Sequence, residues 1–111
     1  MQWLIIARDG TDPEAPARRQ AARPAHLENA ARLQASGHLI VGGALIDGAG
    51  SMIGSAAIAQ FASQAELDHW LATDPYVTGG VWREIQVLPY RVAPHYEFPS
   101  CPPPGDAGAR S

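Results

Sequence analysis

The residues best suited to acid–base chemistry are a histidine in the segment Arg23-Pro24-Ala25-His26 and an aspartate that precedes a proline, Asp74. An imidazole titrates near neutral pH, so His26 can both take up and release a proton in the cell. Proline suits the first turn of a helix, and we therefore predict that a helix begins near Pro24 and carries His26 in its first turn. The helix N-terminus and burial would favour the neutral, basic imidazole, and a carboxylate such as Asp74 could fix its tautomer.

Both residues also have a structural interpretation. His26, Ala30 and Leu33 recur at helical spacing, with Leu27 and Ala31 beside them, so His26 could be a core histidine that is hydrogen-bonded to the backbone. An aspartate before a proline commonly caps nearby N–H groups in a turn. That role for Asp74 is compatible with a catalytic one.

Three more residues are candidates for contacts with a substrate. Arg23 could bind an anionic group through two hydrogen bonds, or it could exchange salt bridges on the surface. Tyr76 could line a pocket as a hydrogen-bond donor, or it could be a partly buried structural tyrosine. Ser55 could face a ligand, although a serine after a glycine in a strand often serves packing alone.

Several kinds of site are excluded or disfavoured. The eight basic residues are all arginines, so neither a Schiff base nor a P-loop lysine is available. The glycine-rich segment 48–54 is followed by a predicted strand, whereas a dinucleotide loop must be followed by a helix. His38, His69 and His95 are dispersed, and Cys101 has no cysteine partner. We therefore expect neither a metal nor a cofactor.

Charge and hydropathy restrict the partners and the location. The net charge is −3, the isoelectric point is about 5.7, and the arginines form no dense patch, which argues against nucleic-acid binding. No segment approaches the ~20 apolar residues that span a bilayer, and no signal segment opens the chain. With a single cysteine, these features predict a cytoplasmic protein without a membrane partner.

Apolar periodicity and turn residues predict the elements around these candidates. The order is β-α-β-β-α-β, a ferredoxin-like α+β arrangement, over a domain of residues 1–92. Residues 93–111 form a Pro/Gly-rich C-terminal tail, whose last dozen residues we expect to be loosely packed. The predicted strands are 2–8, 38–46 with a bend at Gly42-Gly43, 52–61 and 82–92. A helical segment follows the turn at 9–15 and is split by Pro24, so that its main helix runs from about 24 to 36 and is ended by Gly37. The second helix is 63–74, opened by a Ser63/Glu66 capping box.

A sheet covered by helices on one face leaves apolar residues on its other face. Apolar strand residues such as Trp3, Ile5 and Trp82, or their alternating neighbours, must be buried somewhere. Two sheets that face each other solve this problem, so we expect a homodimer.

Several motifs resemble the YciI-like (YCII-related) family over about residues 1–92. They are Arg23-Pro24-Ala25-His26-Leu27, Gly42-Gly43-Ala44-Leu45, Gly54-Ser55, Asp74-Pro75-Tyr76-Val77 and Ile85-Gln86-Val87-Leu88-Pro89-Tyr90. The resemblance implies a ferredoxin-like protomer that dimerises into an α+β barrel. It also implies a site built from the histidine of the first helix and the aspartate after the second, which are His26 and Asp74 here.

The leading hypothesis is a cofactor-independent enzyme of lyase or isomerase type that acts on a small, anionic or phenolic metabolite. His26 would shuttle a proton, Asp74 would orient the imidazole, and Arg23 would anchor the ligand. One member of the resembling family is similar to an enzyme that eliminates chloride from a hydroxylated ring, which makes lyase chemistry plausible. The alternative is a non-catalytic small-ligand-binding or accessory dimer that uses the same cleft.

Overall fold

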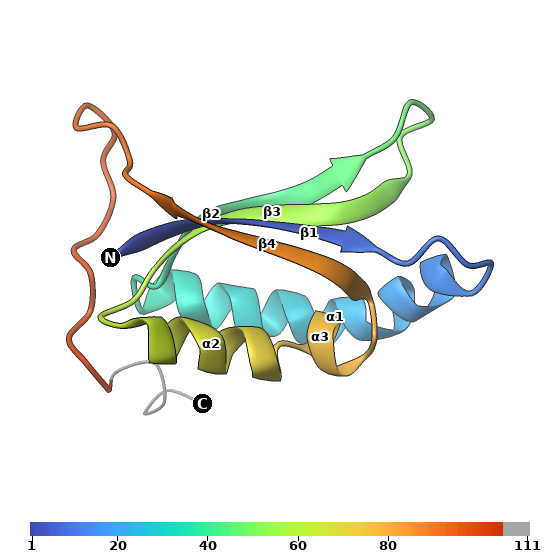
Figure 1. Ribbon diagram of the computed structural model, residues 1–111, viewed down its shortest axis with the longest axis horizontal. Coiled ribbons are helices and arrows are strands. Elements are labelled where there is room, and N and C mark those ends of the chain that lie inside the picture. The colour runs from blue at the N-terminus through green and yellow to red at the C-terminus, as the bar shows by residue number, and fades with distance from the viewer. Residues whose placement is uncertain (106–111) are drawn as a thin grey trace.

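Four antiparallel strands and two main helices make up the fold in the computed structural model, which describes residues 1–105. The sheet has the strand order β2-β3-β1-β4, and the helices lie together on one of its faces (Figure 1). This arrangement confirms the predicted α+β class and the β-α-β-β-α-β order. The elements are β1 Gln2–Asp9, α1 Ala15–Ala35, β2 Leu39–Ile46, β3 Met52–Gln60, α2 Gln64–Thr73, α3 Pro75–Thr78 and β4 Trp82–Tyr90.

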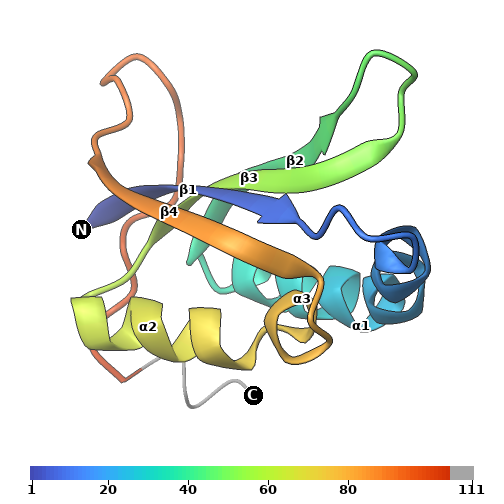
Figure 2. The same ribbon diagram turned by 45° about the vertical axis from the view of Figure 1, so that its right-hand side comes forward.

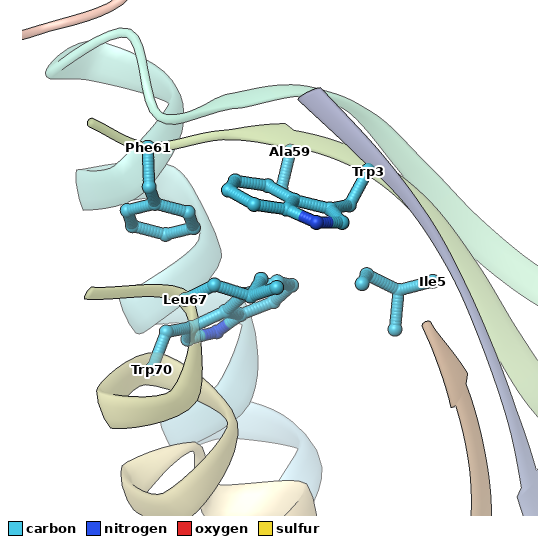
Figure 3. Close-up of a cluster of buried hydrophobic side chains, with 6 residues drawn as sticks. All are labelled: Trp3, Ile5, Ala59, Phe61, Leu67 and Trp70. Atoms are coloured by element: carbon cyan, nitrogen blue, oxygen red, sulfur yellow. The ribbon is translucent and has the colours of Figure 1, made fainter. Parts of the chain in front are cut away.

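The hydrophobic core lies between the sheet and the helix layer. Along the central strand β1, Trp3, Ile5 and Ala7 point at the helices and are buried, as the alternation of a half-covered strand requires. One cluster joins β1 and β3 to α2, with two indoles and a phenyl ring in contact with aliphatic side chains (Figure 3). A second cluster joins Ala7 to Tyr76, Val81 and Trp82 near α3. This second cluster forms one wall of the candidate site.

Helix α1 is one continuous helix, whereas the sequence predicted a helical segment that Pro24 splits. It begins at Ala15, with Pro16 in its first turn, and continues through Pro24, which is exposed. An internal proline disfavours a helix by about 3 kcal/mol, so tertiary contacts must hold the first half in place. These contacts include the ion pair of Arg19 with Asp9 of β1 and the packing of Ala22 against the cluster around Tyr76. The predicted start near Pro24 is therefore wrong.

The face that α1 turns to the sheet also differs from the prediction. The most covered positions are Ala15, Arg19, His26 and Leu33, together with neighbours that complete one helical stripe. Leu27 and Ala31, expected beside this stripe, are exposed. The helix ends as predicted, with Gly37 at a positive φ of 89° directly after the cap residue Ser36.

The β2–β3 hairpin rises away from the helix layer in both views (Figures 1 and 2). Strand β2 pairs with β3, and its register shifts twice, between Leu39 and Val41 and between Leu45 and Ile46. The bend expected at Gly42-Gly43 is therefore displaced to either side of the glycines. Within the regular stretch, Gly42 pairs with Ala57 and Ala44 pairs with Ser55, so this part of the sheet carries little side-chain bulk.

Helix α2 begins at the predicted cap. The Ser63 hydroxyl accepts a hydrogen bond from the Glu66 backbone N–H. The Glu66 carboxylate instead accepts from the Gly105 N–H, so only half of the capping box forms. Asp74 ends α2, and its side chain caps the following short helix α3 by accepting from the Tyr76 N–H.

The chain after β4 returns along the edge of the domain toward the start of α2 (Figure 1). The buried Gln60 side chain donates to the Pro99 carbonyl, and Pro102 is buried beside Gly37. Residues 99–105 are thus in contact with the body, contrary to the expected loose packing. Residues 106–111 of the expected tail lie outside the described residues.

The sheet face opposite the helices is apolar. Val41, Leu88 and Tyr90 are exposed there, and Leu4 and Ile58 are half-buried neighbours on the paired strands. Among residues 1–105, no helix is long and apolar enough to cross a membrane.

Candidate active site

The Asp74 carboxylate is the most heavily hydrogen-bonded side chain of the domain's helical layer. Its Oδ1 accepts from Asn29 Nδ2 at 3.1 Å and from Trp70 Nε1 at 3.2 Å. Its Oδ2 accepts from the Tyr76 backbone N–H at 2.9 Å and lies 2.7 Å from His26 Nδ1. The side chain is only 1% exposed. Asp74 therefore occupies a rigid, solvent-excluded position.

These contacts determine the charge of Asp74 and the tautomer of a neutral His26. Burial raises the pKa of Asp74, but the hydrogen bonds and charge of its neighbours, His26 first, outweigh burial and leave the pKa below its usual value. Asp74 is therefore a carboxylate that can only accept, and Nδ1 of His26 must carry the hydrogen of their shared bond. The lone pair of a neutral His26 is then on Nε2, which has no hydrogen-bond partner among residues 1–105.

Aromatic rings hold the imidazole plane. The ring of Tyr76 stacks on His26 with 3.7 Å between centroids and 11° between planes. Trp82 meets His26 edge-on at 5.7 Å. Burial raises the pKa of Tyr76, against the opposing charges of Arg19 and Arg23, so its phenol stays protonated. The imidazole can thus change its charge without changing its orientation.

A cavity of about 300 Å³ lies between α1 and the β2–β3 strands, and His26 lines it. This volume is at the lower end of the range for small-molecule pockets. The cavity exists because Gly42, Ala44 and Ala57 present almost no side chain toward the helix. Its walls are apolar and aromatic, with Arg23 among the lining residues. Arg23 makes no ion pair within residues 1–105.

A second polar cluster lines the same cavity. Arg19 Nη1 lies 2.9 Å from both carboxylate oxygens of Asp9, in an ion pair that is almost fully buried. Arg19 Nη2 donates to Ser55 Oγ at 3.1 Å, and Trp82 Nε1 donates to the same oxygen at 3.1 Å. The guanidinium also lies over the Tyr76 ring, 4.7 Å from its centroid. Arg19 is therefore fixed by contacts on three sides.

The residues singled out from the sequence all line this cavity: His26, Asp74, Arg23, Ser55 and Tyr76. His26 lies in the middle of α1, about three turns from Ala15, rather than in the first turn, so the helix N-terminus does not act on it. Sequence reasoning missed Arg19, because Pro24 was expected to separate it from the main helix that carries His26. Among residues 1–105, no group of three or more His, Cys, Asp or Glu side chains could hold a metal ion.

The chain is similar in sequence to known proteins. Residues 1–91 match the family described as the YCII-related domain. The chain is 34% identical over 97 residues to Protein YciI of Escherichia coli O6:H1 and, over the same length, to an uncharacterized protein of Haemophilus influenzae. Each alignment covers 82% of this chain and 97% of the relative.

A solved structure resembles the whole domain. It is the 5-chloro-2-hydroxyhydroquinone dehydrochlorinase TftG from Burkholderia phenoliruptrix in complex with 2,5-dihydroxybenzoquinone. The TM-score is 0.74 and the sequence identity is 26%, and the match covers 87% of this chain and all of that one.

Proposed function

Since the chain belongs to the YCII-related domain family, we propose that it is a cofactor-independent enzyme of lyase or isomerase type. The substrate is a small phenolic or anionic metabolite, and His26 transfers its proton. The similarity to a dehydrochlorinase that was solved with a dihydroxybenzoquinone supports this class of reaction and ligand.

One observation carries the proposal: every acceptor position of the Asp74 carboxylate is used by a donor, so the free lone pair of His26 is on Nε2 beside the cavity. A general base must reach its substrate while its other nitrogen is held in place. Here the holding group is an anion, which stabilises the imidazolium that forms when the proton is taken.

The remaining lining residues suit a flat, negatively charged ligand. Trp82 supplies part of an aromatic ring, and Leu27 and Leu39 supply apolar contacts. Arg23 lies one turn before His26 on the same helix face, where its unpaired guanidinium can attract an anionic oxygen. We propose that Arg23 anchors the ligand while His26 acts on it.

The test is a comparison of the wild type with His26→Asn and with the control His69→Asn. His69 lies on the exposed side of α2, so its replacement controls for the loss of a histidine. The three proteins are incubated with chlorinated and unchlorinated hydroxyhydroquinones, while chloride release and deuterium uptake from heavy water are measured. We expect His26→Asn to lower the rate by about 10²–10⁴-fold with little change in melting temperature, and His69→Asn to leave the rate unchanged.

A different outcome identifies a binding protein. If the wild type binds these compounds but neither releases chloride nor exchanges a proton faster than buffer, the domain does not catalyse and the alternative of a ligand-binding dimer holds. If His26→Asn turns over as fast as the wild type, the base is another residue.

A further inference from the structure

The Ser55 hydroxyl has an unusual hydrogen-bond environment. A hydroxyl group offers two lone pairs and one hydrogen. Both lone pairs are used, because Ser55 Oγ accepts from Arg19 Nη2 and from Trp82 Nε1. Neither a guanidinium nor an indole N–H can accept in return, so the direction of both bonds is unambiguous. The hydroxyl hydrogen must therefore go elsewhere.

The cavity is the place left for that hydrogen. Ser55 is 92% buried, since its exposed fraction is 8%, and it lines the cavity beside His26 and Trp82. Within residues 1–105 it donates to no acceptor. A buried donor without a partner is unfavourable, and a ligand oxygen in the cavity would satisfy it.

The neighbouring charges strengthen this donor. Arg19 is positively charged and hydrogen-bonds to Ser55 directly, which polarises the hydroxyl toward donation. Asp9 neutralises the net charge of Arg19 from the far side, so that Arg19 is fixed and does not move toward a ligand. Arg19 also has a buried Nε–H that bonds to nothing among residues 1–105. The cluster is thus arranged to present one hydroxyl hydrogen to the cavity.

We infer that Ser55 is a dedicated hydrogen-bond donor to a substrate oxygen that carries or develops negative charge, such as a phenolate or an enolate oxygen. The inference deepens the proposed function, since it takes the cavity beside His26 as the substrate site. When His26 Nε2 takes a proton from a substrate O–H, the electron pair of that bond stays on the oxygen. When it takes one from a C–H next to a carbonyl, the pair moves onto the carbonyl oxygen. Ser55 stabilises the oxyanion in either case.

The test uses two probes of nearly equal shape, 4-nitrophenol and 4-nitroanisole. At a pH where free 4-nitrophenol is largely ionised, only this probe presents an anionic oxygen. Binding of both probes to the wild type, Ser55→Ala, Ser55→Thr and the exposed-site control Ser51→Ala is measured by calorimetry. We expect Ser55→Ala to weaken binding of the phenolate by about ten- to a hundredfold, with the nitroanisole affinity unchanged. Ser55→Thr, which keeps the hydroxyl, and Ser51→Ala should behave as the wild type.

Ser55→Ala leaves the N–H groups of Arg19 and Trp82 without an acceptor, and this loss could prevent folding. A further variant is therefore needed. Ser55→Cys keeps the volume but has only a weak donor, and it should lose the same preference for phenolate. The inference is overturned if folded Ser55→Ala or Ser55→Cys keeps the wild-type preference, or if the wild type has no preference. If phenolate binding depends on Ser55 but no turnover depends on His26, this inference holds and the proposed enzyme is rejected. Turnover that depends on His26 but not on Ser55 would do the reverse.

Discussion

Replacing Asp74 by asparagine tests the site because it keeps the shape of the side chain and removes half of its acceptor capacity. The amide has one oxygen for the four donors that the carboxylate satisfies. If that oxygen faces His26 and the Tyr76 N–H, the amide NH₂ faces Trp70 Nε1–H, which cannot accept. If it faces Trp70 and Asn29, the NH₂ faces the Tyr76 N–H, which cannot accept either. One buried N–H loses its partner in both orientations.

The loss of this hydrogen bond determines how much Asp74→Asn should destabilise the fold. A buried donor without a partner destabilises a fold by about 1–3 kcal/mol. For a domain of this size, 1 kcal/mol corresponds to roughly 4 °C in melting temperature, so Asp74→Asn should melt about 4–12 °C lower. Urea unfolding at neutral pH measures the free energy directly. The matched control is Asp68→Asn in α2, because Asp68 is exposed and, within residues 1–105, its side chain bonds only to the Gln64 side chain.

The pH dependence of the free energy of unfolding tests the same hydrogen bonds of Asp74 in a second way. The pKa of Asp74 in the folded chain lies below its ordinary value of 3.8. Its carboxylate therefore stabilises the fold above about pH 3.8, and this contribution is lost as the pH falls through the folded-state pKa. Asp74→Asn lacks this titration, so its stability gap to the wild type should narrow in acid. The reasoning is refuted if the gap equals that of Asp68→Asn, or if it stays constant down to acid pH.

Two further predictions concern the ion pair and the open sheet face. Arg19→Met should lower the free energy of unfolding by about 3–5 kcal/mol in urea, because it leaves the Asp9 carboxylate buried without its cation. Arg18→Met removes a more exposed pair with Asp12 and one hydrogen bond to the Gly80 carbonyl, so it should lower the free energy of unfolding by much less. Equal effects of the two changes would contradict the assigned roles. Because its exposed apolar sheet face must be covered, the protein should be a homodimer at micromolar concentration in light scattering. Leu88→Glu, at a position already 42% exposed, should yield a folded monomer. A wild type that is only monomeric would show that this face is covered in another way.

The architecture was predictable because its signals are local. The short run of aromatic and β-branched residues from Trp3 to Ala7 is typical of a strand. Gly37 and Ser63 mark helix ends through backbone geometry and side-chain capping, which depend on a few neighbouring residues. Such features are the same in the isolated sequence and in the folded chain.

The continuity of α1 through Pro24 was not predictable by the same rules. The polar contacts of Arg19 with Asp9 and Ser55 help to hold the first half on the sheet, and apolar periodicity does not register such contacts. Proline at position 24 argued for a helix start, and only a tertiary contact outweighs that preference. The missed signal was the spacing of Arg19, Arg23 and His26 at i, i+4 and i+7, which places the three on one face once the helix is continuous.

The partners of Asp74 illustrate the remaining limit. The proximity of His26 and Asp74 was expected from the family resemblance, since 48 positions separate them in the chain. Asn29 lies one turn after His26, and Trp70 lies one turn before Asp74. Nothing in their local sequence distinguishes these two residues, which both bond to Asp74, from ordinary helical residues. Their role follows from how α1 and α2 approach each other, which only the folded structure reveals.

The side chains that hold His26 and those that set the size of the cavity belong to different parts of the fold. His26 and Asp74 are held by the helices, whereas the space before them is bounded by Gly42, Ala44 and Ala57 on the outer hairpin. Gly42 and Ala44 belong to an edge strand and to neither hydrophobic cluster, so larger side chains there would shrink the cavity without opening the core. Substitutions on β2 can therefore change which molecules fit the cavity, while His26 and Asp74 keep their positions.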